Sequence, residues 1–197
     1  MRSTRSTWWR GDAGQSMIEF AFVLPMVVML ALGVCEAGYA LLDQHIVTKL
    51  SREGSNLISR DVTLDQATEA MKSMATRPVD FTESSRVIFT VIKKVATTGA
   101  ANFDKVIVYQ RYEYGALAAS SKLKMAGPAT FGAAPNYQAP NSDNNTNLRV
   151  TNLPPELSLV SGALMYVTEV YTTHNLITPL DAFGPVMPDQ LYSIAYF

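Results

Sequence analysis

The side chain whose chemistry is most constrained in this sequence is Glu19, an acid at the head of a long apolar run. Phe20 follows it directly, and no further charged residue appears until Glu36. If the run crosses a bilayer, a central carboxylate costs roughly 2.5–3.5 kcal/mol, and acids retained there are usually functional and paired. Glu19 therefore either has a cationic partner or lies close enough to the end of the run to reach the lipid headgroups.

No catalytic constellation is recognisable elsewhere in the chain. The sequence has no Gly-x-Ser-x-Gly, no phosphate-binding loop and no His-Glu-x-x-His. His45 and His174 lack metal-ligand spacing to each other and to Cys35. A glycosidase needs two carboxylates that meet in space, and nothing in the sequence selects a pair from Glu113, Glu156 and Glu169. We therefore predict a protein that is not an enzyme and that uses no metal ion or cofactor.

Length and charge leave room for one membrane helix and one modest domain. The chain has 197 residues, and its formal net charge of −1 gives no indication of nucleic-acid binding. Cys35 is the only cysteine, so an intramolecular disulfide is impossible and the cysteine count does not indicate a redox compartment. The informative feature is instead the concentration of apolar residues before residue 43.

This apolar block has the length and the flanking charges of a membrane-spanning helix. A bilayer core needs about 20 mostly apolar residues in helical form, and residues 17–42 supply them. Asp43 precedes Lys49, the first lysine after the block, whereas the segment before it carries Arg2, Arg5 and Arg10. The positive-inside rule thus predicts a cytoplasmic N-terminus and an extracytoplasmic remainder. Pro25 removes one backbone hydrogen bond and should bend the helix.

Two ordinary export signals are possible interpretations of the same block. A secretory signal peptide would be cleaved after Ala40, although the apolar region is long for such a signal and begins with a carboxylate. A lipoprotein signal would use Cys35, but Val34 occupies the position before the cysteine, where a small residue is normal. An uncleaved membrane anchor is a further possibility.

The segment from Gly14 resembles a type IV prepilin signal, which has a glycine at the cleavage point and a glutamate at the fifth position after it. Glu-Phe-Ala at 19–21 and Gly-Val-Cys-Glu-Ala-Gly at 33–38 make it similar to the TadE-like family. These are pseudopilins, or minor pilins, of the tight-adherence (Flp) pilus. The resemblance implies cleavage between Gly14 and Gln15 by a prepilin peptidase. The new α-amine on Gln15 would lie about one helical turn from Glu19 and could pair with it, in the same subunit or a neighbour.

The resemblance also implies an organisation and a set of partners. Residues 1–14 would be a cytoplasmic leader, 15–42 a transmembrane helix, and 43–197 an extracytoplasmic domain. The protein would cross the bacterial inner membrane once, or would reside in the pilus outside the cell. Its partners would be the prepilin peptidase, other pilins, the inner-membrane assembly platform and the lipid bilayer, with no nucleic acid. Glu19, Phe20 and Leu24 would be the assembly contacts as the protein initiates or primes the pilus.

Hydrophobic periodicity predicts two helices, and the resemblance implies that they belong to an α/β (α+β) pilin-like fold. A helix over residues 16–59 would extend roughly 65 Å, half in the bilayer and half placing an apolar stripe on the domain. Gly54 is a weak point in this helix rather than a clear end. A second helix is capped by Thr63 or Asp61 and ends before Arg77-Pro78.

Runs of β-branched and aromatic residues predict a small, mostly antiparallel sheet. We expect its strands over residues 86–97, 106–114, 163–173 and 191–197. Strict alternation in the second run would place Val106, Val108 and Tyr112 on one face. Residues 127–147, within a loop at about 126–148, are rich in Pro and Asn, and this composition predicts little buried apolar surface.

Two other functions remain open at this level. A membrane-anchored extracytoplasmic binding module would have its site in the loop at 127–147, and its leader would stay uncleaved. A secreted enzyme with an unrecognised site would be released after Ala40 and would contain clustered, perturbed carboxylates. The mature N-terminus distinguishes both from a pseudopilin.

Overall fold

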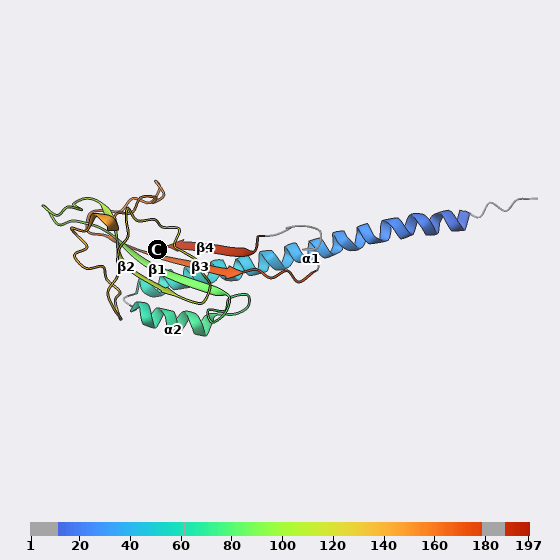
Figure 1. The fold of residues 1–197 in the computed structure, drawn as a ribbon, viewed down its shortest axis with the longest axis horizontal. Coiled ribbons are helices and arrows are strands. Elements are labelled where there is room, and N and C mark those ends of the chain that lie inside the picture. Colours follow the sequence, from blue (N-terminus) through green and yellow to red (C-terminus); the bar gives the residue numbers. More distant parts are fainter. Residues whose placement is uncertain (1–11, 61, 179–187) are drawn as a thin grey trace, which may run out of the picture. The chain divides into compact units, whose positions relative to one another are not determined.

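The computed structural model describes residues 12–60, 62–178 and 188–197. It divides the chain into two compact units: Met1–Tyr39 with Leu176–Met187, and Ala40–Asn175 with Pro188–Phe197. The predicted leader falls almost entirely in residues 1–11, outside the described residues. The predicted α+β class is confirmed: the chain has a long N-terminal helix, a second helix and one four-stranded antiparallel sheet (Figure 1).

Helix α1, Asp12–Ile58, is a single helix of 47 residues, close to the predicted range of 16–59. Pro25 lies inside it, so the carbonyl of Ala21 cannot receive the usual backbone hydrogen bond. Helix α2, Leu64–Met74, begins at Thr63, whose hydroxyl accepts from the backbone of Gln66 while the Gln66 side chain accepts from Thr63. This reciprocal capping box fixes the start of α2. The other candidate cap, Asp61, lies outside the described residues.

The sheet has the strand order β2-β1-β3-β4, with every neighbouring pair antiparallel. Strand β1 is Ser85–Lys94, β2 is Val106–Tyr114, β3 is Leu164–Thr173 and β4 is Gln190–Tyr196. A short 3₁₀ turn, η1, spans Thr146–Leu148. All four strands fall where β-branched and aromatic residues predicted them, and β2 has the predicted bounds.

One face of the sheet packs against α2 and the second half of α1. The shared core contains buried side chains from all of these elements: Val47, Leu50 and Ile58 of α1, Met71 of α2, and Val87, Phe89, Val170 and Leu191 of the strands. Three polar contacts also join α1 to β4. Gln44 donates to the Tyr192 carbonyl at 3.2 Å, the hydroxyls of Ser51 and Ser193 lie 2.9 Å apart, and Ser55 donates to the Ala195 carbonyl at 2.9 Å. The second half of α1 is therefore an integral part of the domain.

The other face of the sheet buries an acid. Glu169 of β3 is fully buried and accepts hydrogen bonds from the Lys122 backbone at 2.8 Å, from the Ser121 hydroxyl, and from the hydroxyls of Tyr171 and Tyr192, each at 3.1 Å. Burial, together with this carboxylate, raises the pKa of both tyrosines. Burial also lowers the pKa of Arg111. The segment that includes Ser121 and Lys122 is therefore held to the sheet by a carboxylate rather than by apolar contact alone.

The prediction that Tyr112 shares a face of β2 with Val106 and Val108 is wrong. Val91 of β1 pairs with Gln110, but its neighbour Ile92 pairs with Val108, so Tyr109 is an extra residue in β2. This bulge interrupts the alternation. Val108 consequently packs with Ile92 on one face, whereas Tyr112 packs against the helix-side core.

The loop at 126–148 makes more contacts than its composition predicts. Ala139 and Leu148 are buried beside Val95 and Ile107. The Asn102 amide donates to the carbonyls of Ser142 and Asn145, both at 2.9 Å. Side chain–backbone hydrogen bonds therefore hold a segment whose apolar residues are few.

Candidate functional site: the N-terminal helix

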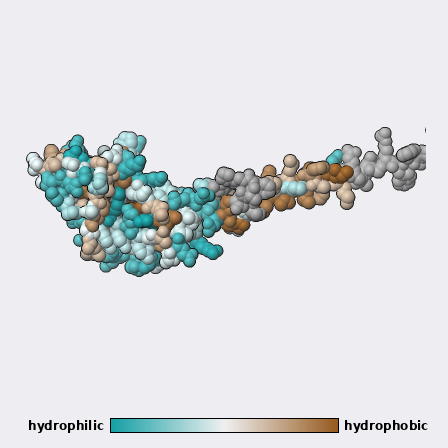
Figure 2. Space-filling model, viewed as in Figure 1, coloured by the Kyte–Doolittle hydropathy of each residue, from teal (hydrophilic) through white to brown (hydrophobic). Residues whose placement is uncertain are grey.

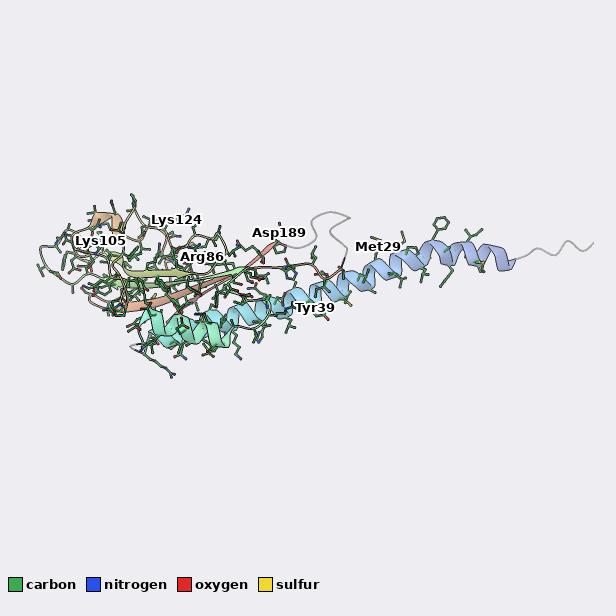
Figure 3. The ribbon with its side chains drawn as sticks, turned by 60° about the horizontal axis from the view of Figure 1, so that its bottom comes forward. Met29, Tyr39, Arg86, Lys105, Lys124 and Asp189 are labelled. Carbon is green, nitrogen blue, oxygen red and sulfur yellow. The ribbon has the colours of Figure 1, made fainter. Side chains whose placement is uncertain are left out.

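The first half of α1 presents an apolar surface with little protein around it. Met17 is 75% exposed, Phe20 63% and Leu24 45%. The most apolar stretch of the helix between Ser16 and Ile58 has none of its residues buried, and by length and composition this helix can cross a membrane. Figure 2 shows the apolar colouring concentrated along this helix, and Figure 3 shows side chains such as Met29 and Tyr39 directed away from its axis. Such a surface requires lipid or another apolar helix to cover it.

The candidate cleavage point lies within the helical backbone. Gly14 and Gln15 both belong to α1, so the bond between them is part of its first turn. Glu19 is exposed and is four residues after Gln15, roughly 6 Å further along the axis. Residues four apart share one face of a helix. A positive group at Gln15 could therefore reach the Glu19 carboxylate without a change in the backbone.

The structure adds one acid whose role the sequence leaves undefined. Glu36 is fully buried, and its carboxylate accepts from the backbone of Ile177 at 3.2 Å and of Thr178 at 2.9 Å, and from the Thr178 hydroxyl at 2.7 Å. The sequence marks Glu36 only as an acid at the end of an apolar run. Its partners lie about 140 residues away in the chain, so no local pattern could identify them.

A second polar contact reaches α1 just beyond the apolar half. Nδ1 of His174, directly after β3, lies 3.0 Å from Oδ2 of Asp43, and the imidazole is almost completely buried. Within residues 12–60, 62–178 and 188–197, no group of three or more His, Cys, Asp or Glu side chains could hold a metal ion.

These features define an α+β protein with a long N-terminal helix, apolar over its first half, a second helix and a four-stranded antiparallel sheet. A model of the TadE-like protein family matches residues 14–56. The resemblance to TadE-like proteins is thereby confirmed over these residues, which begin at the candidate cleavage point and include Glu19, Pro25 and Glu36. The match suggests involvement in the tight-adherence pilus system, whose TadE-like members are pilus-associated structural proteins. No curated protein and no solved structure matches the chain.

Proposed function

We propose that this protein is a pseudopilin, or minor pilin, that takes part in initiating or priming a tight-adherence pilus. The observation that carries the proposal is the family match that begins at Gly14, on a helix whose first half is apolar and exposed. In this proposal a prepilin peptidase cuts between Gly14 and Gln15 and releases residues 1–14. The remaining helix, residues 15–42, anchors the protein once in the bacterial inner membrane, with its N-terminus in the cytoplasm and residues 43–197 outside the cytoplasm.

Pairing of Glu19 with the new amine explains why an acid is retained in an apolar helix. Before assembly, the carboxylate lies near the membrane surface and its cost is small. As the helices of neighbouring subunits pack, the amine on Gln15 neutralises it in a medium of low dielectric constant, where an unpaired charge is costly. Phe20 and Leu24 lie one and five residues beyond Glu19, and their exposed side chains would contact the neighbouring helix.

The decisive experiment is mass spectrometry of the N-terminus, using protein extracted from membranes of cells with and without their prepilin peptidase. We expect a chain that begins at Gln15 when the peptidase is present and at Met1 when it is absent. A Gly14→Val variant should stay uncleaved in both strains. A Gly33→Val control should be cleaved in the strain that has the peptidase. A chain that begins at Leu41, or that keeps Met1 in the presence of the peptidase, would overturn the proposal.

A further inference from the structure

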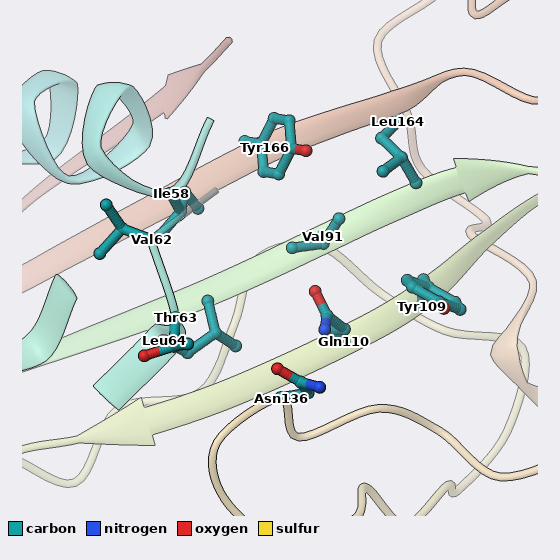
Figure 4. A pocket seen from close by; sticks show the side chains of 10 residues that line it. All are labelled: Ile58, Val62, Thr63, Leu64, Val91, Tyr109, Gln110, Asn136, Leu164 and Tyr166. Atoms are coloured by element: carbon teal, nitrogen blue, oxygen red, sulfur yellow. The ribbon is translucent and has the colours of Figure 1, made fainter. Parts of the chain in front are cut away.

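A cavity of about 250 Å³ lies on the helix-covered face of the sheet, beside the turn that joins α1 to α2. Ile58, the last residue of α1, and Val62, shortly before α2, line one side of it, and Val91 of β1 lines it from the sheet. Val91 pairs with Gln110 of β2 on one side and with Tyr166 of β3 on the other, so these three residues form a row across the sheet. Figure 4 shows Val91 at the middle of the group, with Gln110 toward β2 and Tyr166 on β3.

The bulge in β2 brings two adjacent side chains to this cavity. In a regular strand Tyr109 and Gln110 would point to opposite faces. Because Tyr109 is the extra residue of the bulge, both line the cavity. The Nζ of Lys93 lies 5.4 Å from the centre of the Tyr109 ring and 3.1 Å from a carboxylate oxygen of Asp143, which helps to hold the ring in place. Bulges commonly redirect side chains at binding sites.

The described part of the lining is uncharged and offers polar side-chain groups that could bind a ligand. Among the residues that the structure describes, no Asp, Glu, Lys, Arg or His lines the cavity. Within the described part of the chain, the amides of Gln110 and Asn136 and the hydroxyls of Tyr109 and Tyr166 form no hydrogen bonds with other residues. Each amide can donate hydrogen bonds through its nitrogen and accept them through its oxygen, and each hydroxyl can also donate or accept. The remaining surface consists of aliphatic side chains and tyrosine rings.

We propose that this cavity binds one residue of a neutral saccharide. A pyranose ring combines an apolar face of C–H groups with a rim of hydroxyls that both donate and accept. Val91 and the two tyrosine rings would contact the C–H groups, while Gln110 and Asn136 would bond the hydroxyls. The volume is below the roughly 300–1,000 Å³ usual for drug-sized ligands, so it suits a single ring. A charged ligand would find no counter-charge among the described lining residues, and its desolvation would be unfavourable.

A peptide strand is a poorer fit than a sugar. The backbone groups of β1 here are already paired with β2 and β3, so an extended peptide could not extend the sheet at this point. The polar side chains of the lining surround a compact volume rather than a strand edge. Every residue that lines the cavity lies after residue 56, outside the family match, so this inference does not depend on the proposed role in a pilus.

Saturation-transfer NMR on the full chain tests the inference directly. The protein is held in a zwitterionic phosphocholine detergent, because glucoside and maltoside detergents would themselves supply a sugar. The probes are glucose, galactose, mannose and N-acetylglucosamine, and then the same sugars as terminal residues of disaccharides, with triglycine as the peptide probe. Irradiation of the aromatic protons should transfer magnetisation to the ring protons of at least one sugar. Transfer to the free sugars would indicate a soluble saccharide as the ligand, and transfer only to disaccharides would indicate the end of a glycan.

Matched variants separate binding in this cavity from contact with the surface. Gln110→Leu keeps the size of the side chain and removes the amide, and Asn136→Ala removes the second amide from an exposed position. Each should weaken binding about tenfold, as expected when a hydrogen bond is lost. Gln138→Ala is the control, because Gln138 is exposed on the same loop and does not line the cavity. The inference is overturned if no sugar receives transfer, if triglycine receives more than any sugar, or if both amide variants bind as well as the control.

Discussion

Gly54 of α1 and Thr168 of β3 pack so closely that no β-carbon fits between them. A Cβ built on Gly54 would lie 2.7 Å from Cγ2 of Thr168 and 3.2 Å from the sulfur of Met71. The sequence marks Gly54 only as a weak point in a long helix. In the structure it is a position where the helix backbone comes close to the sheet, and the absence of a side chain is what permits this approach.

Gly54→Ala should therefore destabilise the domain, although alanine favours a helix by about 1 kcal/mol over glycine. The added methyl group overpacks the contact, which typically costs about 1–3 kcal/mol. Thr168→Ser removes Cγ2, so the double variant should recover part of the loss. Denaturant unfolding of both single variants and the double variant measures this coupling. Gly38→Ala is the control, since nothing lies within 4 Å of its added Cβ. Additive effects of Gly54→Ala and Thr168→Ser would show that the contact is absent.

Glu36→Ala should loosen the segment that follows β3. It removes the acceptor for the backbone N–H groups of Ile177 and Thr178. Hydrogen exchange at these two amides, followed in detergent, should become about tenfold faster or more, since both N–H groups lose the acceptor that protects them. Cys35→Ala, at an exposed neighbouring position, should leave the exchange unchanged. Equal exchange rates in wild type and Glu36→Ala would contradict the contact.

Glu169→Gln should destabilise the domain more than the same change at Glu113. The amide group of glutamine would face donors at Ser121, Lys122 and the tyrosine hydroxyls, and at least one of them would lose its acceptor. The expected loss is about 1–3 kcal/mol. Glu113 pairs with Arg86 at 2.9 Å near the surface, where such pairs contribute about 0–1 kcal/mol. Thermal unfolding of the two variants compares them, and equal losses would argue against the buried network.

Asp143→Asn should make the domain less stable at neutral pH, and the difference should disappear in acid. The Thr97 hydroxyl at 2.7 Å and the Lys93 ammonium at 3.1 Å hold the pKa of Asp143 below its ordinary value of 3.8. A depressed folded-state pKa adds stability above the unfolded value, and this stability is lost as the pH falls through the folded value. Melting temperatures of wild type and variant should thus converge below about pH 4. A difference that stays constant down to the acid transition would refute the assignment.

Glu19→Ala should separate processing from assembly if the proposed function is correct. The variant keeps Gly14 and Gln15, so mass spectrometry should still show a chain that begins at Gln15. Pili counted by electron microscopy should be strongly reduced, because the new amine loses its carboxylate partner as the helices pack. Glu19→Asp should restore them in part. Normal piliation in the Glu19→Ala variant would show that Glu19 is not an assembly contact. The proposed cleavage after Gly14 would be unaffected by this result.

Local patterns in the sequence were sufficient to predict the elements of this fold. The apolar run before residue 43, the capping pattern at Thr63 and the β-branched run at 106–114 each depend on residues within a few positions of one another, so their secondary structure is largely a local property. The glycine–glutamate spacing at Gly14 and Glu19 is equally local, and the family match begins there.

The tertiary structure decided everything that depends on distant partners. Glu36 and Thr178 are 142 residues apart, and Ser121 and Glu169 are 48 apart, so no periodicity relates them. The extra residue at Tyr109 appears only when β2 pairs with β1, and it determines which side chains meet in the cavity. The sequence by itself determined where the chain is helical, extended or able to cross a bilayer. Only the folded chain determined which polar groups are buried together, because burial and hydrogen bonding depend on packing between segments.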